Sequence, residues 1–165
     1  MFTAEDHAFM AEALRLAERG LNTATPNPRV GCVVVRDASV VGRGWHEKAG
    51  LPHAEIIALR EAGPLAQGAT LYLNLEPCSH HGRTPPCAEA VVEARVARVV
   101  AAMQDPNPVV AARGVQRLRD AGVRVDCGLM ETEARELNIG FVSRMTRGRP
   151  LVRMKIAASL DGKTA

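Results

Sequence analysis

The 165-residue chain has few aromatic side chains: one tryptophan, one tyrosine and three phenylalanines, or 3% of its residues. Proteins that bind single-stranded nucleic acids stack bases on aromatic side chains, and this chain offers few of them. Its formal net charge of +3 suits a small anionic substrate but falls short of the concentrated basic face of a nucleic-acid-binding protein. We therefore expect no nucleic-acid partner.

Long apolar runs are also missing. No stretch is long enough to cross a bilayer, so we expect no association with a membrane. The N-terminal residues include Glu5 and Asp6 and lack the basic and apolar regions of a secretory signal, which predicts a cytoplasmic protein. The four cysteines are then expected to be free thiols rather than a disulfide framework.

The chain does contain a regular alternation of helical and strand-like segments. With 47% hydrophobic and 24% charged residues, it fits one ordinary globular domain with a sizeable core. Apolar periodicity predicts helices at residues 3–19, 53–62, 86–95, 114–121 and 131–147. Short apolar runs predict strands at residues 30–35, 40–45, 70–75, 96–103 and 123–127, and the stretch 151–156 also alternates like a strand. The first two strands form an antiparallel hairpin and the others imply parallel crossovers. We therefore expect an α/β fold with a mixed central sheet and helices on both faces.

Two separated stretches contain residues that can hold a metal ion. The first is His53, with Glu55 two positions later, and the second is the segment 77–87, which contains Cys78 and Cys87. One imidazole and two thiols supply three ligands to zinc, which prefers four, and a fourth position left to water is typical of a catalytic site. Thiolate ligands favour zinc over harder divalent ions.

Glu55 has a different role from the three metal ligands. On a helix, residues two positions apart diverge by about 200 degrees, so His53 and Glu55 are not simple neighbours on one ion. A carboxylate placed there can instead move protons between water and a substrate. Cys87 follows Pro85 and Pro86 at a predicted helix start, where the helix dipole favours the thiolate that zinc requires.

A lone histidine or cysteine is more often a core or surface residue than a ligand. Here, however, the order of residues matches the deaminase pattern H-x-E…P-C-x-x-C. The spacing departs from it, because eight residues rather than two separate Cys78 from Cys87. His80 and His81 lie in this interval and are expected to contact substrate or solvent. Cys32 and Cys127 fall in predicted strands and are expected to be buried thiols without a chemical role.

With these residues considered, the chain closely resembles the deaminase domain of the bifunctional deaminase/reductases of riboflavin biosynthesis, in the cytidine-deaminase-like superfamily. The resemblance rests on residues 25–31, 50–55, 75–87 and 103–108. The long interval between the two cysteines is itself a mark of this family. The resemblance implies a three-layer α/β/α cytidine-deaminase-like fold.

The family also implies an activity and a substrate. The reaction is zinc-dependent hydrolytic deamination of 2,5-diamino-6-(5-phosphoribosylamino)pyrimidin-4(3H)-one to 5-amino-6-(5-phosphoribosylamino)uracil and ammonia. One zinc per chain would be held by His53, Cys78 and Cys87, with Glu55 as the catalytic proton carrier. The family's substrate pocket is matched by Asn27, His46, His80, Arg83, Asp105 and Asn107. Arg83 is expected to hold the phosphate, because a guanidinium can form paired hydrogen bonds to an oxyanion.

The resemblance also predicts the domain organisation. Residues 1–148 form the zinc-dependent deaminase domain, and residues 149–165 form a linker and the first strand of a reductase domain that is otherwise absent. NADPH would be a cofactor only where that domain is present. Three points stay open: a homo-oligomer, a zinc deaminase acting on another base, nucleoside or RNA base, and a binding module that zinc merely stabilises. The last would need a closed four-ligand site, and Glu55 would be superfluous in it.

Overall fold

A mixed five-stranded sheet forms the centre of the protein. The computed structural model describes residues 1–80, 85–108 and 110–164. The strands are β1 (Gly31–Arg36), β2 (Ser39–Trp45), β3 (Thr70–Leu73), β4 (Arg98–Ala101) and β5 (Arg124–Cys127). They lie in the order β2-β1-β3-β4-β5, with β1 antiparallel to β2 and β3, and with β3, β4 and β5 parallel. The predicted hairpin and mixed sheet are confirmed.

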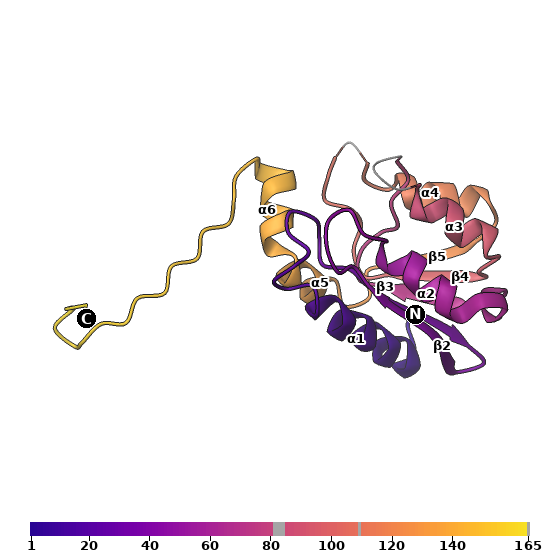
Figure 1. Ribbon diagram of the computed structural model, residues 1–165, viewed down its shortest axis with the longest axis horizontal. Coiled ribbons are helices and arrows are strands. Elements are labelled where there is room, and N and C mark those ends of the chain that lie inside the picture. The colour runs from indigo at the N-terminus through magenta and orange to yellow at the C-terminus, as the bar shows by residue number, and fades with distance from the viewer. Residues whose placement is uncertain (81–84, 109, 165) are drawn as a thin grey trace.

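Helices cover both faces of this sheet. They are α1 (Ala4–Glu18), α2 (Ala54–Ala62), α3 (Cys87–Glu93), α4 (Arg113–Asp120), α5 (Glu131–Leu137) and α6 (Ile139–Arg147), with a short 3₁₀ helix, η1 (Gly63–Ala66). Helices α1 and α5 lie on one face, and α2, α3 and α4 lie on the other (Figure 1). The predicted three-layer α/β/α arrangement is therefore confirmed. No helix in the described ranges is long and apolar enough to span a membrane.

Helix α2 packs unusually close to the hairpin, and glycine makes this possible. A Cβ atom added at Gly44 of β2 would lie 2.1 Å from the carbonyl oxygen of Ala54 and 2.7 Å from the backbone nitrogen of Ala58. Since a side chain at this position would collide with the helix backbone, the absent Cβ sets how near α2 lies to the sheet. The first residue of α2 is Ala54, so this contact lies at the start of the helix.

Helix α1 is tied to the sheet by a buried ionic cluster. Thr3 and Asp6 form a complete capping box at its first turn. Oδ2 of the Asp6 carboxylate accepts the Thr3 backbone N–H. Oδ1 accepts hydrogen bonds from the Tyr72 hydroxyl and from Arg98, both at 2.7 Å. Burial alone would raise the pKa of Asp6, but the hydrogen bonds from Arg98, Thr3 and Tyr72 outweigh it and hold this pKa well below its ordinary value.

The helix predicted at residues 131–147 is divided in two. Asn138 lies between α5 and α6 with a φ of −107° and is almost fully buried. Its side-chain oxygen accepts the backbone N–H of Arg29 at 2.8 Å, and its side-chain nitrogen donates to the Arg29 carbonyl at 2.9 Å. Because these bonds fix the Asn138 side chain to a distant loop, the helix is interrupted where apolar periodicity alone predicts continuity.

The strand predicted at residues 151–156 is not formed. Residues 149–157 contain no helix or strand, and the described part of the segment beyond them contains only an isolated bridge between Ala158 and Thr164. Val152, Met154 and Ile156 are exposed, and the segment extends away from the sheet (Figure 1). An alternating stretch needs a neighbouring strand for its backbone hydrogen bonds, and this stretch has none among the described residues.

Candidate active site

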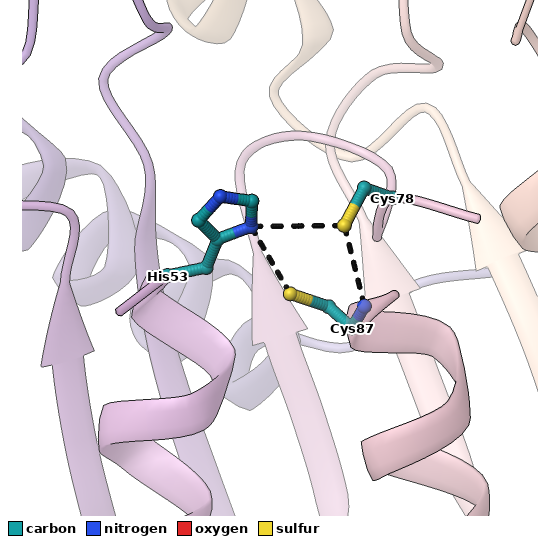
Figure 2. A group of neighbouring side chains, drawn as sticks. All are labelled: His53, Cys78 and Cys87. Atoms are coloured by element: carbon teal, nitrogen blue, oxygen red, sulfur yellow. Dashed lines mark hydrogen bonds between the residues drawn. The ribbon is translucent and has the colours of Figure 1, made fainter. Parts of the chain in front are cut away.

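The three proposed metal ligands meet where two helices begin. His53 is the residue before α2, Cys87 is the first residue of α3, and Cys78 lies in the loop that follows β3. The His53 Nδ1 atom is 3.2 Å from the Cys87 sulfur and 3.6 Å from the Cys78 sulfur, and the backbone N–H of Cys87 donates to the Cys78 sulfur at 3.2 Å (Figure 2). The three ligand atoms lie within 4.8 Å of one another. The structure therefore brings together the three residues that the sequence predicted.

The chemistry of this group fits zinc. Hydrogen bonding from the Cys87 side chain, from His53 and from the Cys87 backbone N–H lowers the pKa of Cys78 despite its burial. Cys87, the other thiol of the pair, has a raised pKa, and the contact with Cys78 also raises the pKa of His53. The two thiols and the imidazole share protons through these contacts, and a bound metal cation would displace those protons. One nitrogen and two sulfurs form a donor set that zinc favours. Among the described residues the group offers three donors, as an open zinc site requires.

Glu55 lies beside the metal ligands, in the first turn of α2. Glu55 is only 3% exposed to solvent. Burial, together with the nearby Cys78, raises the pKa of Glu55 to about 7. A carboxyl group with such a pKa can both accept and donate a proton near neutral pH. The position and the environment of Glu55 agree with the predicted role of proton carrier, which stays a prediction.

A cavity of about 600 Å³ opens over His53, Glu55 and Cys78. Its size is typical of a small-molecule site. It is also lined by five of the six residues predicted to contact substrate: Asn27, His46, His80, Asp105 and Asn107. Arg83, the sixth, lies outside the described residues, as does His81. A second cavity, of about 950 Å³, lies against α5 and α6 and is not lined by the metal ligands or Glu55.

His46 is a structural neighbour of the metal ligand as well as a cavity residue. It is 3% exposed, and its ring lies edge-on to that of His53 at 5.2 Å between centroids. Its Nδ1 is 3.2 Å from the Pro52 carbonyl oxygen, which can only accept, so Nδ1–H is the donor. The other nitrogen, Nε2, then accepts from the Asn27 side-chain amide at 3.0 Å. Burial lowers the pKa of His46, which favours this neutral form.

Two buried asparagines hold the loop that carries Asn27. Asn74 accepts the backbone N–H of Gly31 at 2.9 Å and donates to the Arg29 carbonyl at 2.9 Å. Asn138 accepts the backbone N–H of Arg29 and donates to the same carbonyl oxygen. The loop that precedes β1 is therefore anchored at its end by the side chain of Asn74, which directly follows β3, and by that of Asn138, at the α5–α6 junction. Sequence reasoning missed both asparagines, because their partners are distant in the chain.

The cavity is also lined by two acidic residues, Glu76 and Asp105. Asp105 accepts the backbone N–H of Asn107 at 2.9 Å and donates its own N–H to the side chain of Glu76 at 3.0 Å. Burial, and to a lesser extent the nearby Glu76, raises the pKa of Asp105. Glu76 also lines the cavity, as do Phe141 and Met145 of α6. No pattern in the sequence pointed to a role for Glu76, Phe141 or Met145.

The remaining cysteines are only partly as predicted. All four cysteines are free thiols, which confirms the absence of a disulfide framework. Cys32 is fully buried, and burial raises its pKa far above the usual value. Cys127 lies at the end of β5 and is only partly buried, so the prediction of a buried thiol there was wrong. β5 is an edge strand with no further strand beside it among the described residues, so its residues are less fully buried than those of a central strand.

This fold and this site define a class of protein. Residues 3–103 match the family model for the cytidine and deoxycytidylate deaminase zinc-binding region, and the chain therefore belongs to that family. Within it, the chain is 60% identical, over 98% of its length, to riboflavin biosynthesis protein RibD of Escherichia coli strain K12. It is 54% identical over 99% of its length to RibD of Haemophilus influenzae. The resemblance inferred from the sequence is confirmed.

Solved structures give the same result. The chain superposes on Acinetobacter baumannii RibD with a TM-score of 0.95 and 56% identity, covering 98% of this chain and 45% of that one. It superposes on a diaminohydroxyphosphoribosylaminopyrimidine deaminase/5-amino-6-(5-phosphoribosylamino)uracil reductase of Thermotoga maritima with a TM-score of 0.91 and 42% identity, covering 96% and 46%. The chain spans 44% of the length of both curated relatives named above.

Proposed function

We propose that the chain is a zinc-dependent deaminase that converts 2,5-diamino-6-(5-phosphoribosylamino)pyrimidin-4(3H)-one to 5-amino-6-(5-phosphoribosylamino)uracil and ammonia in riboflavin biosynthesis. The observation that carries this proposal is the group of His53, Cys78 and Cys87 beside the buried Glu55. His53, Cys78 and Glu55 line a cavity of about 600 Å³. High identity to RibD proteins supports the choice of substrate.

The reaction exchanges an amino group for oxygen at one ring carbon. Zinc held by His53, Cys78 and Cys87 would activate water for attack on that carbon. Glu55 accepts a proton from the water and delivers it to the adjacent ring nitrogen, which makes the carbon more electrophilic. The same carboxyl then carries the second proton of the water to the departing amine. The carbon–nitrogen bond breaks, ammonia leaves, and a carbonyl group remains on the ring.

The cavity supplies hydrogen-bonding groups for the heterocycle and its sugar phosphate. Asn27 is held by the neutral His46, which uses one N–H of its amide and orients the rest of the group. Asp105, Asn107 and His80 line the same cavity. These residues are proposed to contact substrate, with Arg83 proposed as the phosphate ligand.

The domain organisation is part of the same proposal. Residues 1–148 form the deaminase domain, and residues 149–165 would be a linker and a segment that becomes the first strand of a reductase domain where that domain is present to pair with it. Any NADPH site would belong to that second domain and would have no part in deamination. The proposed place of action is the cytoplasm.

Ammonia release by the zinc-loaded protein tests the function. We expect release from the diaminopyrimidine phosphate and none from cytidine, a free base or an RNA base. Release only from a nucleoside or from RNA would contradict the substrate assignment and favour the alternative deaminase. No release from any of them, with a fourth protein ligand on the zinc, would favour the zinc-stabilised binding module.

A further inference from the structure

Glu76 is a buried acidic residue that the proposed chemistry does not use. It lies two positions before Cys78 and is 5% exposed. From the described residues its carboxylate accepts three backbone hydrogen bonds at 3.0 Å each: from Asp105 and Ala112 on Oε2, and from Val115 on Oε1. A buried charge must be paired or hydrogen-bonded, and here three backbone N–H groups stabilise it.

Two of the donors, Ala112 and Val115, lie at the start of α4, and the third, Asp105, lines the cavity in the segment before it. The N-cap of α4 is Ala112, which has a φ of +62° and no side chain that could cap the helix. Glu76 replaces that cap from a distance, since it accepts the N–H of Val115 in the first turn and places a negative charge at the helix N-terminus. Glu76, two positions before the proposed metal ligand Cys78, thus caps α4.

The same segment is attached to Glu76 at both ends. The backbone N–H of Glu76 donates to the carbonyl of Met103 at 2.9 Å, just before Asp105. At the other end, a Cβ atom added at Gly114 would lie 1.9 Å from the carbonyl oxygen of Pro77, so the first turn of α4 abuts the residue before Cys78. Residues 76–78, which include the proposed ligand Cys78, are therefore connected to Asp105 and to the first turn of α4 through Glu76 and Pro77.

We propose that Glu76 is a positioning residue that holds Asp105 and Asn107 at the distance from the metal site at which they engage the substrate. This inference rests on the proposed function. Asp105 is held directly, and Asn107 follows because its N–H is bound to the Asp105 carboxylate. Glu76 itself does not touch the reacting atoms and acts through these two residues.

The test is the substitution Glu76→Gln, which keeps the size of the side chain. A glutamine has one oxygen and one NH₂ group, and an NH₂ group cannot accept from a backbone N–H, so at least one of the three bonds is lost. We expect KM for the diaminopyrimidine phosphate to rise about tenfold while kcat falls by less than about threefold, because the loop relaxes but Glu55 keeps its place. The zinc content stays at one per chain.

Glu61→Gln is the matched control. The Glu61 carboxylate also accepts a backbone N–H, from Arg43 at 3.0 Å, but it is exposed and lies in the last turn of α2. We expect its KM and kcat to equal those of the wild type. If Glu76→Gln lowers only the unfolding temperature and leaves KM unchanged, Glu76 is a purely structural residue and the proposal is wrong. A fall in kcat without a change in KM also contradicts it.

A second measurement needs neither turnover nor a variant. In the wild-type protein, NMR scalar couplings across the hydrogen bonds should connect the Glu76 carboxyl carbon with the amide nitrogens of Asp105, Ala112 and Val115. Absence of these couplings in the folded protein overturns the proposal, even if Glu76→Gln fails to fold. A wild-type protein that shows the couplings but releases no ammonia overturns the proposed function. The inference that Glu76 positions Asp105 and Asn107 for the substrate then fails as well.

Discussion

The close contact between Gly44 and α2 makes Gly44→Ala a severe test of how the site is positioned. The added Cβ would lie 2.1 Å from the Ala54 carbonyl oxygen, and moving it even to 3.0 Å requires the helix and strand to separate by at least 0.9 Å. Overpacking of this kind costs about 1–3 kcal/mol of unfolding free energy. His53 and Glu55 flank Ala54, so the same shift moves both, and a misplacement of about 1 Å can reduce turnover by about 100-fold.

Gly140→Ala is the control for Gly44→Ala. Gly140 lies in α6, and nothing is within 4 Å of a Cβ atom placed there. We expect this variant to gain about 0.5–1 kcal/mol of unfolding free energy, since alanine is the better helix former. Urea unfolding and the rate of ammonia release would be measured for both variants. A Gly44→Ala protein with wild-type stability and turnover would refute the argument that the missing Cβ sets the position of α2.

Three further perturbations test other parts of the structure. Asp6→Asn should cost about 3 kcal/mol at pH 7, because it leaves Arg98 without its buried partner. Because the pKa of Asp6 is lowered in the folded state, its ionised carboxylate stabilises the fold above the ordinary aspartate pKa, and this stabilisation is lost as pH falls through the folded-state pKa. In urea unfolding, acidification should therefore reduce the unfolding free energy of Asp6→Asn less than that of the wild type. Cys78→Ala should reduce bound zinc from one per chain to a small fraction after dialysis, measured by metal analysis, and retention of a full equivalent would contradict the ligand assignment. Asn138→Ala should cost about 2 kcal/mol, because it leaves the backbone N–H of Arg29 without its partner; unchanged urea unfolding would show that this contact does not stabilise the fold.

The features that could be predicted from the sequence are those with local causes. The α1 capping box follows from Thr3 and Asp6, three positions apart. The prolines before His53 and Cys87 mark the starts of α2 and α3 to within a residue: His53, predicted as the first helical residue, is the N-cap of α2, and Pro86 is the N-cap of α3. The hairpin follows from two apolar runs around a polar turn. The same helix starts place His53 and Cys87, so these metal ligands could be predicted from local sequence patterns.

The features that were missed have distant causes. The break at Asn138 depends on hydrogen bonds to Arg29, 109 positions earlier, so local periodicity carries no trace of it. Glu76 looks like an ordinary loop carboxylate until its three backbone donors, 29 to 39 positions later, are known. The strand predicted at residues 151–156 had the correct alternation but no pairing partner among the described residues. In each case, tertiary contacts decided the outcome and the local pattern did not.

The central claim is that Glu55, beside a three-ligand zinc site, carries the protons of a deamination. The most direct test measures zinc content and single-turnover ammonia release for the wild type and Glu55→Gln with the diaminopyrimidine phosphate. We predict that the variant keeps one zinc per chain and binds the substrate, but deaminates it about 100-fold to 10,000-fold more slowly, because glutamine cannot accept and donate the protons. Near-normal deamination by Glu55→Gln would contradict the claim.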